Sequence, residues 1–157
     1  MLTWPDLVAY VGNVHARTYE AAALLEDGHL GWAPRPGEFT AGEVALHIAN
    51  TRLMSVLAIE GKPMRYRGHT LGPAADAALL RQALLRSSKK TIARLHDADP
   101  AAFVRNTRGD EIPAWRLVLS GFIEHEVHHR SQLCGYLSAL GLPAPALYGL
   151  HAEELPR

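Results

Sequence analysis

The longest helix that the sequence predicts lies late in the chain, over about residues 113–140, and the rest of the chain is organised around it. Pro113 suits a first helical turn, and Gly141 and Pro143 end the helix. If straight, such a helix is roughly 42 Å long. Three of the nine histidines of the chain fall close together within it.

Three further helices are predicted upstream. An apolar stripe at helical spacing predicts the first over about residues 5–25. The second begins with a capping box, in which Thr40 and Glu43 satisfy each other's free backbone N–H groups, and it extends to about residue 60. The third covers about residues 74–96, with a weaker apolar pattern and a charged face that is typical of exposure to solvent.

The segments between these helices are long. Gly109 and Asp110 are turn residues and predict a hairpin-like connection over residues 103–112. The second predicted helix is apolar on two sides, which indicates burial against more than one neighbour and favours a homodimer interface. We therefore predict an all-α fold, a four-helix bundle with long inter-helix loops, in a single domain over residues 1–157.

Composition argues against several classes of partner. Lysine plus arginine and aspartate plus glutamate both number 16, so charge gives no reason to expect nucleic acid or an anionic membrane. No apolar run approaches the roughly 20 residues that span a bilayer. The first residues lack the segments of a signal peptide, so we expect a cytoplasmic protein. The single cysteine, Cys134, excludes an intrachain disulfide and a cysteine-based zinc site.

The histidines of the fourth predicted helix indicate a metal site. His125 and His129 are four residues apart, so their Cβ atoms lie roughly 6 Å apart on one helix face. Two neutral imidazoles at that separation can share one metal ion. Buried imidazoles also need partners for their nitrogens, and a cation would supply one. Helical spacing predicts that this face is a core stripe, which comprises Trp115, Val118, Phe122, His125, His129, Gln132, Tyr136 and Ala139.

A third ligand must come from another helix. His47 is the candidate, because it lies on an apolar stripe between Val44 and Ile48, and helices packed roughly 8–10 Å apart let imidazoles meet at one ion. His15, in the middle of the first predicted helix, is the reserve candidate. The alternative for His47 is a core histidine whose nitrogens are satisfied by protein groups alone.

The remaining histidines are expected at the surface. His128 lies about 100° from the core stripe, among small and polar residues, which favours a surface position or a dimer contact over a ligand role. Arg130 also lies off that stripe, where it would pair with a carboxylate or line the entrance to the site. Four other histidines are expected in exposed loops or at helix ends: His29, His69, His96 and His151.

The segment His125-Glu126-Val127-His128-His129 also fits H-E-x-x-H, the zinc metalloprotease pattern in which glutamate is the general base. A third ligand would then come from downstream, as Glu153 or Glu154. Proteases of this kind need a substrate cleft, usually beside a sheet, and this chain predicts little strand. The protease interpretation therefore ranks well below a three-histidine site.

These residues resemble the DinB/YfiT-like family of metal-dependent enzymes. The resemblance rests on Glu124-His125-Glu126-Val127-His128-His129-Arg130-Ser131-Gln132-Leu133 and on His47 within Glu43-Val44-Ala45-Leu46-His47-Ile48-Ala49. The order of four helices and the ending Gly141-Leu142-Pro143 agree, so the similarity spans nearly the whole chain. Ser131 departs from the family, which often has glycine after the arginine.

The resemblance implies that His47, His125 and His129 surround a divalent ion with waters at open positions, and that the protein forms a homodimer. Relatives include S-transferases that use bacillithiol and maleylpyruvate isomerases that use mycothiol. The implied partners are therefore a small-molecule thiol and an electrophilic substrate. The family name refers to DNA-damage induction and does not imply DNA binding.

Three neutral histidines leave an ion its full charge and open positions, which is typical of a catalytic metal. Zn²⁺ or Ni²⁺ suits imidazole ligands best, with Mn²⁺ and Fe²⁺ as further options. The first hypothesis is a thiol-dependent S-transferase in which Glu126 accepts a proton or orients a histidine. A partly exposed salt bridge is the alternative for Glu126. The other functional hypotheses are a non-catalytic metal-binding stress-response module and a metal-dependent hydrolase.

Overall fold

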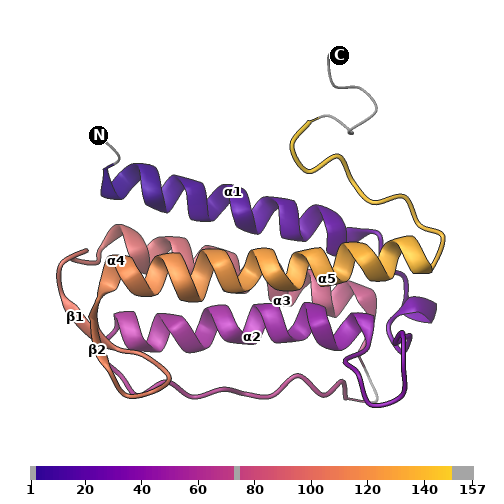
Figure 1. The fold of residues 1–157 in the computed structure, drawn as a ribbon, viewed down its shortest axis with the longest axis horizontal. Coiled ribbons are helices and arrows are strands. Elements are labelled where there is room, and N and C mark those ends of the chain that lie inside the picture. Colours follow the sequence, from indigo (N-terminus) through magenta and orange to yellow (C-terminus); the bar gives the residue numbers. More distant parts are fainter. Residues whose placement is uncertain (1–2, 73–74, 150–157) are drawn as a thin grey trace.

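The computed structural model describes residues 3–72 and 75–149 and shows long helices packed side by side (Figure 1). Helix α1 runs over Trp4–Ala23, α2 over Ala41–Ile59 and α3 over Ala77–His96. A fourth long helix, composed of several segments, completes the bundle. The all-α four-helix bundle predicted from the sequence is confirmed.

The fourth helix consists of three consecutive segments. These are α4 (Ala114–Leu117), the π-helical segment η2 (Val118–Glu124) and α5 (His125–Ala139). The sequence predicted one uniform α-helix over residues 113–140. A π-helix bonds residue i to residue i+5, so its wider turns rotate the following side chains relative to a uniform α-helix.

The core stripe predicted for the fourth helix is therefore partly wrong. Trp115 is 45% exposed, and His125 and His129 are half-buried at the edge of the core. Arg130, which we expected off the core, is only 3% exposed and donates to the backbone oxygen of Val14 (3.4 Å). The buried side chains follow another line along this helix, namely Val118, Phe122, Glu126, Arg130, Leu133 and Leu137.

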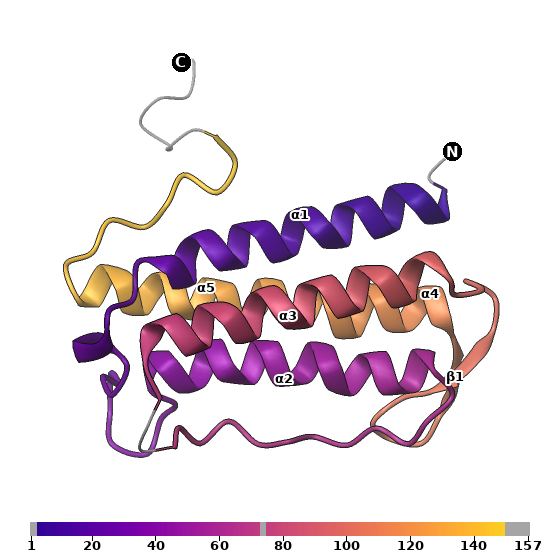
Figure 2. The same cartoon turned by 180° about the vertical axis from the view of Figure 1, so that it is seen from behind.

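The helix directions explain the long connection between α2 and α3. These two helices run parallel to each other and antiparallel to α1 and α5 (Figures 1 and 2). Parallel neighbours need a crossover, and its described part, residues 60–72, runs back along α2. Helix α2 thus contacts α3, α5 and this crossover within the same chain. The apolar sides of α2 therefore pack against neighbours within the same chain, without a second copy of the protein. The homodimer stays a prediction.

Local capping fixes where the helices begin. The Thr40 hydroxyl accepts from the Glu43 amide (3.2 Å) and the Thr40 amide donates to Glu43 Oε2 (2.9 Å), which confirms the predicted capping box of α2. Helix α3 begins later than expected, at Ala77. The carboxylate of Asp76 accepts from the Leu79 amide (2.6 Å) and caps the helix there.

A short hairpin closes one end of the bundle, as the sequence predicted. Strand β1 (Phe103–Arg105) pairs antiparallel with β2 (Glu111–Pro113), and Val104 lies opposite Ile112. The turn between them includes Gly109 with φ +85°, a conformation that suits glycine.

Among the described residues the core has three apolar clusters, of which a small one lies beside the hairpin (Ala58, Val104, Ala114 and Leu117). The two larger clusters are separated along the bundle by buried polar side chains. One cluster joins the hairpin-distal ends of the helices and includes Val44, Ile48 and Leu133, whereas the other includes Val11 and Phe122. The polar side chains between them include His15, Arg52, Ser87 and Glu126. Among the described residues, no helix is both long enough and apolar enough to cross a membrane.

Candidate metal centre

The structure brings together all three histidines that the sequence predicted as ligands. His47 comes from α2, and His125 and His129 come from successive turns of α5. Nε2 of His47 lies 3.1 Å from Nε2 of His125 and 3.1 Å from Nε2 of His129. Ligand nitrogens roughly 2.0–2.1 Å from one tetrahedral ion lie roughly 3.3–3.4 Å apart. The observed separations therefore fit the donors of one ion.

The outer nitrogens of two of these rings have protein partners. Nδ1 of His47 lies 2.6 Å from the hydroxyl of Tyr66, and Nδ1 of His129 lies 3.0 Å from Oε1 of Gln132. Gln132 in turn donates to the Tyr136 hydroxyl (2.8 Å). Such contacts fix the ring orientation, so that Nε2 faces the centre.

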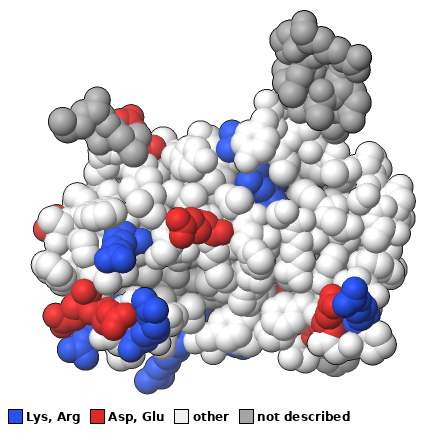
Figure 3. All heavy atoms as spheres, in the orientation of Figure 1, with Lys and Arg blue, Asp and Glu red and all other residues white. Residues whose placement is uncertain are grey.

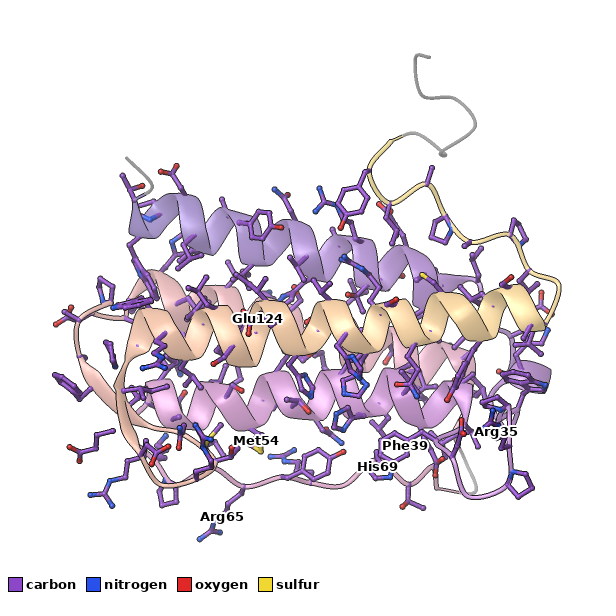
Figure 4. All side chains as sticks on the ribbon, in the orientation of Figure 1. Arg35, Phe39, Met54, Arg65, His69 and Glu124 are labelled. Atoms are coloured by element: carbon purple, nitrogen blue, oxygen red, sulfur yellow. The ribbon has the colours of Figure 1, made fainter. Side chains whose placement is uncertain are left out.

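Two residues of the crossover belong to the centre and were missed by the sequence analysis. The Tyr66 hydroxyl lies 3.0 Å from Nδ1 of His69, so Tyr66 joins His69 to His47. His69 was expected to be exposed, but it is half-buried and stacks on Phe39 with ring centroids 3.8 Å apart (Figure 4). A loop has no helical periodicity, so no sequence pattern distinguished these two side chains.

The surroundings keep the three imidazoles neutral at pH 7. Burial, with repulsion from the neighbouring histidines, lowers the pKa of His47 to about 4 and that of His125 to about 4. Burial also lowers the pKa of His129, although its contact with Gln132 opposes this effect. Neutral imidazoles have free lone pairs, which is the form that a metal ion binds.

Four other histidines of the described residues lie outside the centre. His15, the reserve candidate, is 2% exposed, with Nδ1 3.0 Å from the Ser88 hydroxyl. His128 and His96 are exposed, as predicted, whereas His29 is half-buried and accepts from the Glu26 amide (3.1 Å). His151 and the alternative ligands Glu153 and Glu154 lie outside the described residues.

Glu126 lies in the polar part of the core. It is 1% exposed, its Oε2 accepts from Nε of Arg52 (2.7 Å), and Oε1 accepts from Nη2 of the same guanidinium. Burial alone would raise the pKa of Glu126, but the charge and hydrogen bonds of Arg52 outweigh it and lower the pKa. Among the described residues it forms no hydrogen bond with the three histidines. The proton-accepting role of Glu126 stays a prediction.

A cavity of about 500 Å³ opens beside the centre, and His47 and His125 form part of its wall. The other walls come from α2, the crossover, the turn of the hairpin, α4 and the segment η2. Gly121 of η2 lines it, where an added Cβ would lie 3.2 Å from Leu117 Cδ1 and 3.3 Å from Ser55 Oγ. The arrangement offers ligand donors together with room for a small organic molecule.

Comparison with known proteins agrees with this architecture. A DinB-like protein from Bacillus cereus matches with a TM-score of 0.75 and 21% identity, over 92% of this chain and 97% of that one. A DinB-like protein from Bacillus subtilis matches with a TM-score of 0.72 and 20% identity, over 90% and 97%. These likenesses show the fold. No protein of curated function matches the sequence. The DinB superfamily pattern matches residues 11–133, so the chain belongs to the DinB superfamily.

Proposed function

We propose that His47, His125 and His129 bind a divalent ion, and that the protein is a metal-dependent enzyme such as a thiol-dependent S-transferase. The cavity of about 500 Å³ beside His47 and His125 is the observation that carries this proposal. Structural metal sites are usually closed by protein ligands, whereas catalytic sites keep a position open to substrate. The cavity therefore favours an enzyme over a non-catalytic metal-binding module.

The residues of the chain have distinct roles in this proposal. The three neutral imidazoles hold the ion, while Tyr66 and Gln132 orient two of them. When bound, the ion would supply Lewis acidity that lowers the pKa of a thiol beside it. The thiol sulfur would form a bond to the electrophilic carbon of the second substrate as the bond from that carbon to its leaving group breaks. The leaving group would depart as an anion (chloride in the case of monochlorobimane), and the thiol proton would pass to solvent. Zn²⁺ or Ni²⁺ suits this donor set, and Mn²⁺ and Fe²⁺ remain options.

Glu126 enters the proposal as a positioning residue. Its carboxylate is ionised and bound on both oxygens by Arg52, so accepting a proton would require that ion pair to open. A metal-dependent hydrolase would use the same three histidines, with water in place of the thiol, and the same assays separate the two reactions.

Metal content tests the first half of the proposal. Protein purified without a histidine tag is expected to contain about one divalent ion per chain by elemental analysis. His129→Ala should lose it, because it removes one of three donors. His128→Ala is the matched control, since His128 is the neighbouring residue and is exposed. Full metal content in His129→Ala would overturn the proposed site.

Thiol transfer tests the second half. The metal-loaded protein is assayed with bacillithiol, mycothiol and glutathione in turn, with monochlorobimane as the electrophile. We expect conjugation with at least one thiol, lost on addition of a chelator and in His129→Ala. Metal binding without activity toward any thiol would favour the non-catalytic module, and thiol-independent ester hydrolysis would favour the hydrolase.

A further inference from the structure

We propose that the cavity beside the histidines binds an organic carboxylate, with its apolar body along the cavity wall and its carboxylate on Arg108. This inference rests on the proposed function for the position of the reacting group, which would face His47 and His125. It adds the chemical class of the substrate and a residue that selects it.

The middle of the cavity is suited to an apolar group. Met54 from α2, Met64 from the crossover and Leu117 from α4 line it, and Figure 4 shows Met54 extending from α2 toward the crossover. Methionine side chains are flexible and polarisable, so they adapt to apolar ligands of different shape. The neighbouring hydroxyls of Thr51 and Ser55 are neutral. This part of the wall therefore contains no charged side chain.

The charged end of the cavity lies at the hairpin. Arg108, in the turn between β1 and β2, is the one formally charged side chain among the described residues that line the cavity. Charged side chains of both signs gather at this end of the molecule, at the lower left of Figure 3, and few lie over the middle of the same face. Of these charged groups, Arg108 is the one in the described cavity lining, so a ligand that extends from the histidines toward the hairpin meets it.

The geometry of Arg108 leaves its guanidinium open to a ligand. Nε lies 3.3 Å from Oδ2 of Asp110, and in the part of the chain that the structure describes the two terminal nitrogens have no hydrogen-bond partner. Asp110 thereby engages one edge of the planar group. The opposite edge has the paired donors that bind a carboxylate through two parallel hydrogen bonds.

The turn that carries Arg108 is held in place by hydrogen bonds. Oδ1 of Asn106 accepts from the amides of Arg108 and Asp110, both at 2.9 Å, and Nδ2 of Asn106 donates to Asp110 Oδ2 (3.0 Å). The backbone N–H of Asn106 also donates to the backbone carbonyl of Asp110 (3.0 Å). The backbone at Arg108 is therefore fixed at the rim, so a ligand that binds there does not have to order the loop.

Methionine methyl NMR gives a direct test, because two of the three methionines of the chain line this cavity. Protein labelled at the methionine methyl carbons is titrated with 4-phenylbutyrate and with its neutral amide, in the presence of a chelator. We expect the carboxylate to shift the Met54 and Met64 signals and to bind more tightly than the amide. The Arg108→Gln variant should bind the carboxylate about 5- to 10-fold more weakly, whereas its affinity for the amide should be unchanged.

Arg105→Gln is the matched control, since Arg105 lies in the same hairpin, is exposed and does not line this cavity. The inference is overturned if neither methionine signal responds or if the wild-type protein does not bind the carboxylate more tightly than the amide. It is also overturned if the two arginine variants weaken carboxylate binding equally. Because the titration is free of metal, its failure is separate from failure of the metal site. Metal content in the His129→Ala and His128→Ala variants reports on that site alone.

Discussion

Arg52 and Glu126 form a buried ion pair that joins α2 to α5, the two helices that carry the three histidines. Their side chains are 3% and 2% exposed, and Nε of Arg52 lies 2.7 Å from Oε2 of Glu126. Glu126 immediately follows His125, and Arg52 lies on the next turns of α2 after His47. Nη1 of Arg52 also donates to the Leu84 carbonyl of α3 (2.9 Å). The pair thus sets the register of both helices beside the centre.

The first prediction concerns this pair. Arg52→Met leaves the buried carboxylate of Glu126 without its cationic partner and with the neutral His15 ring nearby (Nε2 to Oε2, 3.4 Å), so the free energy of unfolding should fall by about 3–5 kcal/mol. Adding Glu126→Leu should recover most of the lost free energy of unfolding, because an apolar pair can replace a buried ion pair. The double variant should still bind metal more weakly than wild type, since it lacks the bond that sets the register. Urea denaturation and competition with a chelating dye measure the two effects.

Arg94→Met is the control for the ion pair. Arg94 pairs with Glu60 at 2.8 Å, but its side chain is 51% exposed, and such pairs contribute less than about 1 kcal/mol. An equal loss of stability in the Arg94 and Arg52 variants would contradict the special role of the buried pair.

Tyr66→Phe tests the hydrogen bond between the crossover and His47. It removes the hydroxyl that lies 2.6 Å from Nδ1 of His47 while keeping the ring. Loss of a hydrogen-bond partner of a metal-binding histidine typically weakens metal binding about 10- to 100-fold. Tyr10→Phe, at an exposed tyrosine of α1, should leave the metal affinity unchanged. If Tyr66→Phe binds metal as wild type does, this hydrogen bond has no orienting role.

The pH dependence of stability should carry a contribution from His15. Burial, with the nearby charge of Arg52, lowers the pKa of His15 to about 3. The unfolded chain takes up a proton at this residue near pH 6.5, whereas the folded chain does so only near pH 3. Its contribution to the free energy of unfolding is therefore complete above pH 6.5 and is lost progressively as the pH falls from 6.5 to 3. Between pH 7 and pH 5 the loss is about 2 kcal/mol.

Urea denaturation at pH 7 and pH 5, in a chelator, measures this effect. His15→Gln keeps a polar group near Ser88 and should reduce the loss of stability on acidification by about that 2 kcal/mol. His96→Gln, at an exposed position, should leave the pH dependence as it is. An unchanged pH dependence in His15→Gln would show that the buried ring does not resist protonation.

A pair of glycine substitutions tests the packing at the start of α2. A Cβ on Gly42 would lie 2.7 Å from Leu71 Cδ1 and 3.1 Å from the backbone oxygen of Leu30. Gly42→Ala should therefore lower the free energy of unfolding by about 1–3 kcal/mol. Gly135→Ala on α5 meets no atom within 4 Å and should raise it by about 0.5–1 kcal/mol. Thermal melts compare the two, and equal effects would contradict the crowding at Gly42.

Features that depend on neighbouring residues in the chain were predictable from the sequence. The helices follow from apolar periodicity, and the start of α2 follows from the pairing of Thr40 with Glu43. The convergence of His47 with His125 and His129 was also predicted, because the four-residue spacing and the apolar stripe on α2 limit which faces can meet. These signals are local in origin, so a single sequence contains them.

The tertiary structure alone decided which side chains surround the histidines. The π-helical segment η2 brings Glu126 and Arg130 into the core and leaves His125 and His129 at its edge, where the cavity begins. The crossover carries Tyr66 to His47 although no periodic pattern marks that loop. Both outcomes depend on contacts between segments far apart in the chain, whose free energies a local pattern does not contain. The sequence by itself determined the three converging imidazoles, and only packing determined their partners and the open space beside them.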